Sequence, residues 1–350
     1  MTDQTILSIR RPDDWHLHFR DGAAMRSVVP FTAKQFARAI VMPNLSPPVT
    51  TVEAGAAYRD RILAAVPEGI TFTPLMTAYL TDVSDGNELA RGHAEGVFTA
   101  AKLYPAHATT GSAHGVTSVA NIMPALEHMA RIGMPLLIHG EVTDSHVDIF
   151  DREAVFIERT LSKLVRDLPE LKIVFEHITT ADAVAFVDAS GPNVGATITP
   201  QHLHINRNAM FTGGIRPHAY CLPVAKREVH RLALRKAATS GSRKYFLGTD
   251  SAPHPAHLKE HATGCAGCYT AHGAMELYAQ AFEAADALDK LEGFASFYGA
   301  DFYGLLRNPQ KITLAKETWT PPESLPFGDA TIKPLAGGEP LAWRFKGLVG

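Results

Sequence analysis

Short apolar runs alternate with segments of helical periodicity along most of the chain. The runs have the length of buried strands, and the segments between them place apolar side chains at helical spacing. This pattern is typical of a parallel sheet that is covered by helices on both faces. We expect strands at 14–21, 39–44, 70–76, 97–102, 134–139, 172–177, 194–199 and 245–250, and helices at 23–38, 52–66, 87–95, 116–132, 154–167, 181–189 and 228–239.

The number of repeats favours a closed sheet. Eight strands separated by helical segments predict an α/β protein with a (β/α)₈ TIM barrel rather than an open doubly wound sheet. No Gly-x-Gly-x-x-Gly motif follows the first strand, as a dinucleotide-binding fold would require. The length of 350 residues lies within the range of one such barrel. We therefore expect a single domain over 1–350, with its barrel at about 12–300.

The last part of the chain follows a different pattern. After a helical segment at 274–291, the residues from about 308 to 350 are rich in Pro and Gly. Short strand-like pieces occur there at 311–314, 331–333 and 341–345. They predict a small β appendage, packed with the N-terminal segment, outside the barrel.

The first apolar run carries two histidines. In an extended segment side chains alternate between faces, so we expect His16 and His18 to project together and Trp15, Leu17 and Phe19 to project the other way. Histidine is the commonest metal ligand in proteins, although an isolated His-x-His pair is more often structural. The pair is therefore informative only with partners.

The other runs supply such partners, because several stop at a polar residue. These residues are Asn44, Lys102, His139, His177 and Asp250. Functional groups of TIM barrels lie at the C-terminal ends of the strands, so we expect all of them at one mouth with His16 and His18. Imidazoles with one carboxylate suit zinc, whereas a cluster of acids would suit magnesium.

Lys102 is the unusual member of this set. Taken alone, it is most simply interpreted as a lysine in water or paired with a carboxylate. Beside two cations, however, its ammonium would be repelled and would have to lose its charge, which buried lysines do readily. A neutral amine can add carbon dioxide, and the resulting carbamate can bridge two metal ions. Lys102 is thus a candidate bridging ligand.

Composition excludes several classes of partner. The formal net charge is −3 and there is no Lys or Arg block, so we expect a small-molecule partner rather than a nucleic acid. The N-terminus lacks the apolar core of a signal peptide and no long apolar run occurs, so we expect no membrane segment and a cytoplasmic location.

Three cysteines are too few for a disulfide framework in a chain of this length. The pair Cys265 and Cys268 has no second pair to complete a zinc site. A loop shaped by Gly264 and Gly267 that offers backbone groups to a ligand is the favoured interpretation. Two longer loops, at 104–115 and 200–226, are expected to cover the mouth of the barrel, the first as a lid.

Two motifs carry a resemblance to a known family. The stretch Asp14-Trp-His-Leu-His-Phe-Arg-Asp-Gly22 is similar to the N-terminal signature of the dihydroorotases, and Gly248-Thr-Asp-Ser-Ala-Pro-His254, followed by Lys259, resembles their second signature. The resemblance covers nearly the whole chain. It is closest to the compact bacterial type within the amidohydrolase superfamily.

The resemblance implies a binuclear zinc site. His16, His18 and Asp250 would hold the more buried ion, and His139 and His177 the more exposed one. Lys102, carbamylated to N6-carboxylysine, would bridge the two ions together with a hydroxide. The hydroxide would attack the ring amide while Asp250 acts as general acid and base, which in the opposite direction closes N-carbamoyl-L-aspartate into L-dihydroorotate.

The resemblance also implies a set of substrate contacts and an assembly state. Arg20, Asn44 and His254 would bind the substrate carboxylate, and backbone groups of Leu222 and Ala266 would bind the ring amides. Thr109 and Thr110 of the lid would close over the substrate, which His139 would also touch. The assembly would be a homodimer serving pyrimidine (UMP) biosynthesis.

Two alternative functions remain open at this point. A hydantoinase or dihydropyrimidinase would need the same metals but has no ring carboxylate to bind, so Arg20 is the discriminating residue. Arg20 could instead form an ion pair with Asp21 or Asp13. A non-catalytic scaffold homologue should have lost metal ligands, and this chain has not.

Overall fold

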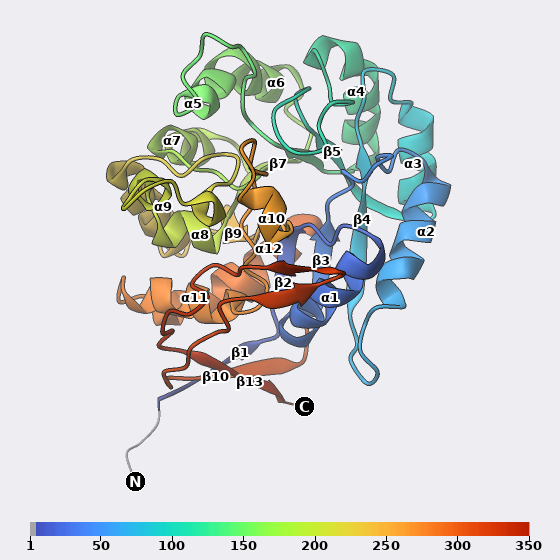
Figure 1. Ribbon diagram of the computed structural model, residues 1–350. Helices are drawn as coiled ribbons and strands as arrows, with labels where there is room; N and C mark the ends of the chain where they lie inside the picture. The colour runs from blue at the N-terminus through green and yellow to red at the C-terminus, as the bar shows by residue number, and fades with distance from the viewer. Residues whose placement is uncertain (1–4, 350) are drawn as a thin grey trace.

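Eight parallel strands form the centre of the computed structural model, which describes residues 5–349; residues 1–4 and 350 of the expected domain lie outside it (Figure 1). The strands are hydrogen-bonded in sequence order. The last strand returns to the first, because His18 N donates to Ser251 O (3.0 Å) and Asp250 N donates to His16 O (2.8 Å). The sheet is thus a nearly closed barrel, as predicted. Its strands are β2 (Asp13–Leu17), β3 (Arg38–Val41), β4 (Thr73–Tyr79), β5 (Phe98–Leu103), β6 (Leu136–Ile138), β7 (Ile173–Phe175), β8 (Val194–Ile198) and β9 (Tyr245–Leu247).

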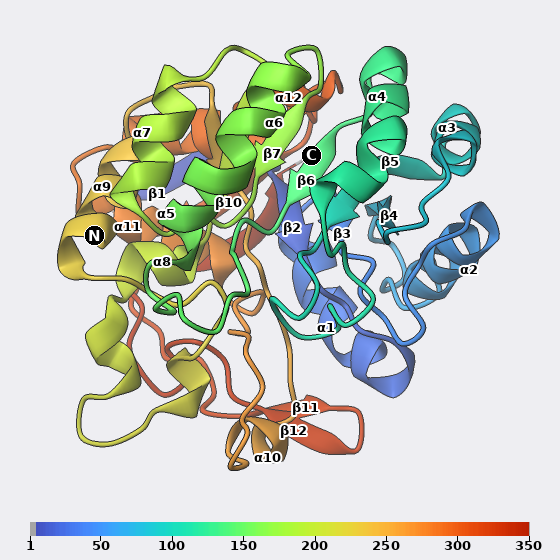
Figure 2. The same cartoon turned by 90° about the horizontal axis from the view of Figure 1, so that it is seen from above.

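Helices surround the strands, with α2, α3 and α4 along one side and α5, α7 and α9 along the other (Figure 2). Side-chain caps fix several of their starts; Thr51 Oγ1 accepts from Ala54 N (3.2 Å), and Thr180 Oγ1 accepts from Ala183 N (3.0 Å). The helices are α1 (Gly22–Gln35), α2 (Val52–Leu63), α3 (Gly86–Ala94), α4 (Met123–Ile132), α5 (Arg152–Phe156), α6 (Ser162–Asp167), α7 (Ala181–Ala189), α8 (Pro200–His204), α9 (Glu228–Ala238), α10 (Ala256–Lys259), α11 (Ala274–Glu283) and α12 (Tyr298–Tyr303).

Two expected helices are clearly shorter than predicted: the one at 116–132 is α-helical only over Met123–Ile132, and the one at 274–291 is broken. The segment 274–291 forms α11 only as far as Glu283, because the chain then turns through Asp286 in a left-handed conformation (φ 53°). A short 3₁₀ turn follows at Leu288–Lys290. The periodicity of the apolar residues continues past this break, so the pattern alone did not reveal it.

The predicted direction of one side chain in the first strand, that of Trp15, is wrong. Leu17 and Phe19 pack outward, as expected, but Trp15 points into the barrel with one residue from each of several other strands. The register of β2 against β3 is irregular between Asp14 and Leu17, which interrupts the expected alternation. Trp15 also stacks on Tyr303 of α12 at 4.5 Å, so this helix closes the N-terminal end of the barrel. The interior residues from the other strands are Ile40, Ala100, Leu137, Val174 and Phe246.

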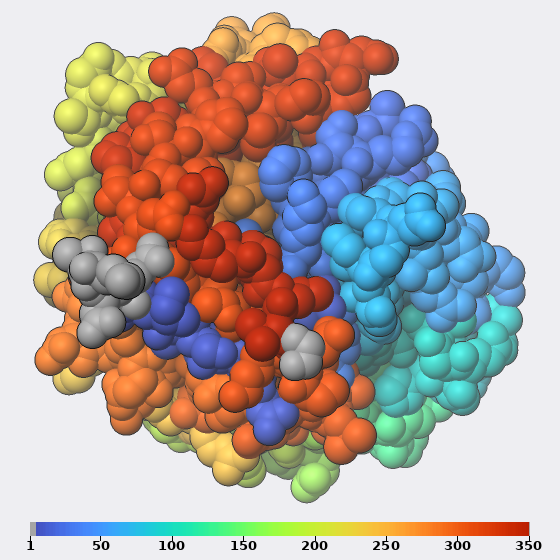
Figure 3. Space-filling model, turned by 90° about the horizontal axis from the view of Figure 1, so that it is seen from below, coloured from blue at the N-terminus to red at the C-terminus, as the bar shows by residue number. Residues whose placement is uncertain are grey.

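The three-stranded sheet of the predicted β appendage lies below the barrel and includes strand β1 from the N-terminal segment (Figures 1 and 3). Strand β10 (Lys311–Ala315) pairs antiparallel with β1 (Ile6–Arg10) on one side and with β13 (Arg344–Val349) on the other. Strands β11 (Leu325–Phe327) and β12 (Ala330–Ile332) form a hairpin. The last strand begins later than the expected 341–345.

A buried carboxylate joins this appendage to the barrel. Glu276 of α11 accepts from Phe345 N (3.1 Å) and from Gln35 Nε2 of α1 (3.3 Å) and is 2% exposed. Burial raises the pKa of Glu276 to about 7. Its ordinary value is about 4.3, so between these two pH values the folded state holds a proton that the unfolded state has lost. The contribution of Glu276 to stability is therefore complete below the lower value and is lost as pH rises toward 7.

We expect the variant E276Q to flatten the fall in stability between pH 5 and pH 8, because a neutral amide cannot titrate. Between pH 5 and pH 8, the free energy of unfolding of the parent protein should fall by on the order of 2 kcal/mol more than that of E276Q. Urea unfolding of metal-free protein at both pH values measures it. Glu283, on the same helix but half-exposed, provides the control E283Q. Equal slopes in E276Q and the parent would contradict the prediction.

Candidate active site

The strand ends bring the predicted polar residues to one cavity at the C-terminal mouth of the barrel. The cavity wall contains all but two of the predicted site residues; Lys102 lies beneath it and His254 lies behind Arg20. Convergence of these groups therefore agrees with the expectation from the sequence. The wall consists of His16, His18, Arg20, Asn44, Tyr104, Thr109, Thr110, His139, His177, Leu222, Asp250, Ala252, Ala266 and Gly267.

His16, His18 and Asp250 form a buried triplet. The Nε2 atoms of both histidines face Asp250 Oδ1, at 3.4 Å and 3.3 Å. The outer nitrogen of each ring has a polar neighbour: Nδ1 of His18 donates to Asn44 Oδ1 (2.8 Å), and Nδ1 of His16 lies 2.7 Å from Glu176 Oε2. An oxygen behind the outer nitrogen turns the inner nitrogen toward a metal. The triplet is therefore oriented as a ligand set.

A second group lies beside the first. The ring of His177 is centred 4.8 Å from that of His16 and 4.9 Å from that of His139. His139 Nε2 contacts Glu141 Oε2 at 2.8 Å, which leaves Nδ1 toward the cavity. His177 Nδ1 is buried and has no hydrogen-bond partner among the described residues.

The charge state of these rings suits metal binding. Burial lowers the pKa of His177 well below its usual value and lowers the pKa of His18 to about 4. Both are therefore neutral near pH 7, the form that ligates a metal. Burial would raise the pKa of Asp250, but the neighbouring His16 and His18 hold it well below its usual range. The neutral rings of His18 and His177 and an ionised carboxylate fit ions such as zinc.

Lys102 lies at the junction of the two groups and is completely buried. In the unmodified chain its Nζ contacts Glu176 Oε2, which is the carboxylate pairing considered as the simpler interpretation. Burial lowers the pKa of Lys102, and the neighbouring Glu176 opposes this shift. Glu176 in turn belongs to a second triplet of close ligand atoms with His16 and His177.

Arg20 is held in a defined direction at the mouth. Its backbone is in a left-handed conformation (φ 63°), and Tyr58 OH donates to its carbonyl (2.7 Å). Its Nε donates to Pro253 O (2.9 Å), and Nη2 donates to His254 Nε2 (2.9 Å). Burial and the adjacent Arg20 lower the pKa of His254 to about 2, so His254 is a neutral acceptor.

The two ion pairs considered for Arg20 are not formed. Asp21 pairs with Arg61 (2.8 Å), and Asp13 pairs with Arg38 (2.6 Å). Among the residues that the structure describes, no carboxylate forms a salt bridge with Arg20. A partly buried guanidinium without a counter-ion is a binding site for an anionic ligand group.

The loop at 104–115 covers the cavity. Asn44 Nδ2 donates to Thr110 O (2.9 Å), and Tyr79 OH donates to Gly111 O (3.1 Å). Thr109 and Thr110 line the cavity beneath it.

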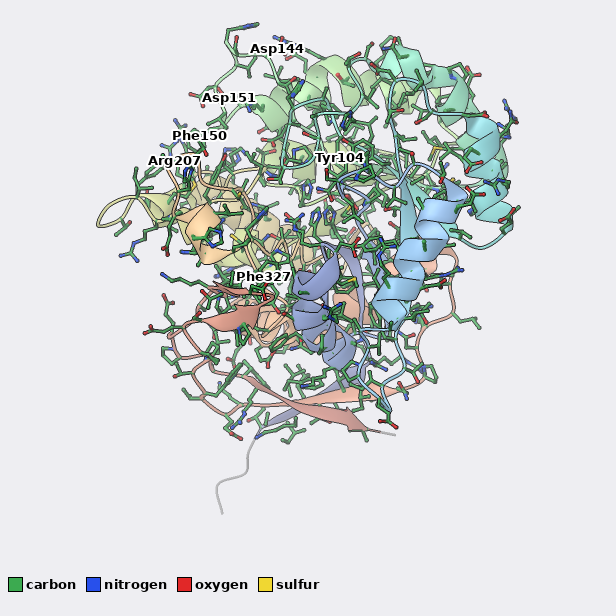
Figure 4. All side chains as sticks on the ribbon, turned by 45° about the vertical axis from the view of Figure 1, so that its right-hand side comes forward. Tyr104, Asp144, Phe150, Asp151, Arg207 and Phe327 are labelled. Atoms are coloured by element: carbon green, nitrogen blue, oxygen red, sulfur yellow. The ribbon has the colours of Figure 1, made fainter. Side chains whose placement is uncertain are left out.

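The second long loop also reaches the mouth. Leu222 lines the cavity, and Gly267 N donates to Tyr220 O (3.0 Å), which joins this loop to the one carrying Ala266. Farther out, Arg207 lies 5.2 Å above the ring of Phe150 (Figure 4).

Three residues of the site were missed by reasoning from the sequence. Glu176 and Glu141 support the rings of His16 and His139, and Tyr104 lines the cavity with a buried hydroxyl that has no partner among the described residues (Figure 4). A spacing of two residues from Lys102 to Tyr104 and from His139 to Glu141 was the available signal, because alternate residues share a face.

Comparisons with known proteins agree with this geometry. The Amidohydrolase family matches residues 13–308. Among characterised sequences, the dihydroorotase of Sphingopyxis alaskensis is 69% identical over 98% of this chain and 99% of its own length, and that of Delftia acidovorans is 67% identical over 98% and 99%.

Solved structures give the same result. Dihydroorotase from Campylobacter jejuni superimposes with a TM-score of 0.91 at 34% identity and covers 99% of both chains. The Saccharomyces cerevisiae enzyme in complex with 5-fluoroorotic acid gives 0.90 at 31% identity and covers 98% of both. An L-hydantoinase from Arthrobacter aurescens shares the fold alone, with a TM-score of 0.81 at 15% identity over 97% of this chain and 83% of its own.

No helix in the described part of the chain is both long and apolar enough to span a membrane.

The chain belongs to the amidohydrolase family and, within it, to the dihydroorotases.

Proposed function

We propose that the protein is a cytoplasmic, homodimeric zinc enzyme that interconverts N-carbamoyl-L-aspartate and L-dihydroorotate in pyrimidine (UMP) biosynthesis. The observation that carries the proposal is the guanidinium of Arg20, which faces the mouth without a carboxylate partner among the described residues. A carboxylate on the substrate supplies that partner. The dihydroorotase relatives support the same substrate class.

Two zinc ions would be held by the residues already described. His16, His18 and Asp250 would hold one, and His139 and His177 the other, with Lys102 as the bridge in its N6-carboxylysine form. When bound, such ions activate a water molecule near neutral pH and polarise a carbonyl oxygen. The buried ring nitrogens without partners and the position of Lys102 between the two groups support this assignment.

Asp250 is suited to carry the proton between the two reaction steps. Its Oδ1 faces His16 and His18, which leaves Oδ2 for the attacking water. Asp250 is ionised, so its free oxygen can accept the proton of that water and then deliver it to the ring nitrogen as the amide bond breaks. The reverse sequence forms the ring.

Other groups hold the substrate in place. Arg20 would bind one carboxylate together with Asn44 and His254, and the neutral His254 accepts from Arg20 at Nε2. Backbone groups of Leu222 and Ala266 would bind the ring amides, His139 would contact the reacting carbonyl, and Thr109 and Thr110 would close over the substrate. All of these except His254 line the cavity.

Hydrolysis of L-dihydroorotate and of dihydrouracil by zinc-supplemented protein tests the proposal. The two rings differ in the carboxylate, so we expect turnover of dihydroorotate with a preference of about a hundredfold or more. The reaction is monitored by the loss of the absorbance of the ring amide. Elemental analysis should give about two zinc ions per chain. A preference for dihydrouracil would place the chain with the hydantoinases, whereas no turnover and no zinc would indicate a non-catalytic scaffold.

A further inference from the structure

A buried lysine outside the metal site joins the two loops that carry Leu222 and Ala266. Lys259 ends α10, and its Nζ donates to three backbone carbonyls, those of Tyr220 (3.0 Å), Cys265 (2.9 Å) and Gly267 (2.5 Å). The residue is 4% exposed. Its three donors are therefore fully used by main-chain oxygens.

The charge of Lys259 has no compensating anion nearby. No salt bridge from Lys259 to a carboxylate occurs within residues 5–349. Burying an unpaired ammonium is costly, and an apolar side chain of similar length would fill the same space at a smaller cost. The three carbonyls thus indicate what this lysine does in the fold.

Because the peptide bond is planar, these contacts also fix the direction of the backbone N–H of Ala266. The carbonyl of Cys265 and the N–H of Ala266 belong to one trans peptide unit and point to opposite sides. Lys259 holds the carbonyl on its own side, so the N–H of Ala266 points away from Lys259. Ala266 lines the cavity, whereas Lys259 is not part of its wall.

The next peptide unit is fixed in the same way. Gly267 N donates to Tyr220 O, which Lys259 also binds, so the carbonyl of Ala266 points away from Tyr220. That side carries His254, to which the backbone of Ala266 is hydrogen-bonded. Both peptide units of Ala266 therefore take their orientation from carbonyls that Lys259 holds.

The loop has little freedom to adopt another path. Gly267 has φ 148°, and a Cβ there would lie 2.6 Å from Ala252 O. Only glycine fits this close approach between the loop and the segment after Asp250. A change in the anchoring of the loop would therefore shift Ala266 relative to the cavity instead of being absorbed locally.

We propose that Lys259 is a positioning residue for substrate binding, which aims the backbone of Ala266 at the ring amide through its three carbonyl contacts. The inference rests on the proposed function. In this role Lys259 contacts neither the metals nor the substrate. Its loss should therefore weaken ring binding while zinc remains bound.

The test compares the zinc-loaded variant K259M with the parent protein. We expect KM for dihydroorotate and Ki for 5-fluoroorotate to rise together by about tenfold or more, with kcat changed by less than about threefold, the pattern of lost binding that is equal in the ground and transition states. Zinc content and the melting temperature should stay close to those of the parent. K259R retains charged donors and should recover most of the loss.

Lys333 provides the matched control. It is exposed and pairs with Glu260, the residue that follows Lys259, at 2.7 Å. K333M removes an ammonium from the same neighbourhood and should leave KM and Ki unchanged. Parent values of KM and Ki in K259M would overturn the inference, as would loss of folding or zinc in both K259M and K259R. If the parent itself does not hydrolyse dihydroorotate, it is the proposed function that fails.

Discussion

Replacing Lys102 by alanine is expected to abolish activity and to reduce the zinc content of the purified protein. Lys102 lies beside Glu176 at the junction of the two ligand sets, and its removal also leaves Glu176 buried without its ammonium partner. A bridging anion contributes several kcal/mol through the ions it holds, so kcat/KM should fall by about a thousandfold or more.

Three measurements on K102A test whether Lys102 bridges the metal ions. Elemental analysis gives the zinc content, dihydroorotate hydrolysis gives the rate, and native mass spectrometry shows whether the parent, unlike the variant, carries the added mass of carbon dioxide. Circular dichroism verifies that the variant folds. Full activity with full zinc content in K102A would disprove the bridging role.

A second lysine at the opposite end of the barrel supplies the control. Lys172 directly precedes β7, and its Nζ donates to Phe302 O (3.1 Å). K172A also removes a lysine next to a barrel strand, but at the N-terminal end, where conserved chemistry is not expected in this fold. It should retain both zinc and activity.

The barrel was predictable because its signal is repeated. Each strand is a short apolar run and each helix restores the helical period, so single errors do not change the count of eight. Helix α7 agrees with the prediction at both ends, since Thr180 caps its start. The errors arose where local geometry departs from the ideal period, at the irregular register around Trp15 and at the left-handed turn of Asp286.

The candidate site was predictable to the extent that polar residues interrupt apolar runs. His139, His177 and Asp250 stand out for this reason, and the structure brings them together. Glu176 did not stand out, because it directly precedes His177 at the end of the same apolar run. Its role depends on which side chains from other strands lie opposite it.

Partners distant in sequence were beyond prediction. Asp21 is adjacent to Arg20 in the sequence, yet it pairs with Arg61 of α2. The contacts of Lys259 are of the same kind, because they involve backbone carbonyls that any residue could supply. Tertiary structure alone decides such pairings.

Arg20 is expected to decide the choice of substrate. In R20A, kcat/KM for dihydroorotate should fall by about a hundredfold to a thousandfold, the usual cost of removing a charged donor from an anionic group. The slower hydrolysis of dihydrouracil should change little, because that ring has no carboxylate for Arg20 to bind. Steady-state kinetics with both substrates therefore measures the change in preference directly.

Two further variants determine how Arg20 acts. R20K keeps the positive charge but loses the planar fork that binds a carboxylate through two parallel hydrogen bonds, so its activity should lie between those of R20A and the parent. R61A removes the exposed guanidinium that pairs with Asp21 beside Arg20 and should leave both activities unchanged. An equal loss on both substrates in R20A would instead assign Arg20 to the support of His254 and His18, which its side chain also contacts. A loss confined to dihydroorotate would mean that one unpaired guanidinium separates this enzyme from the hydantoinases that share its fold.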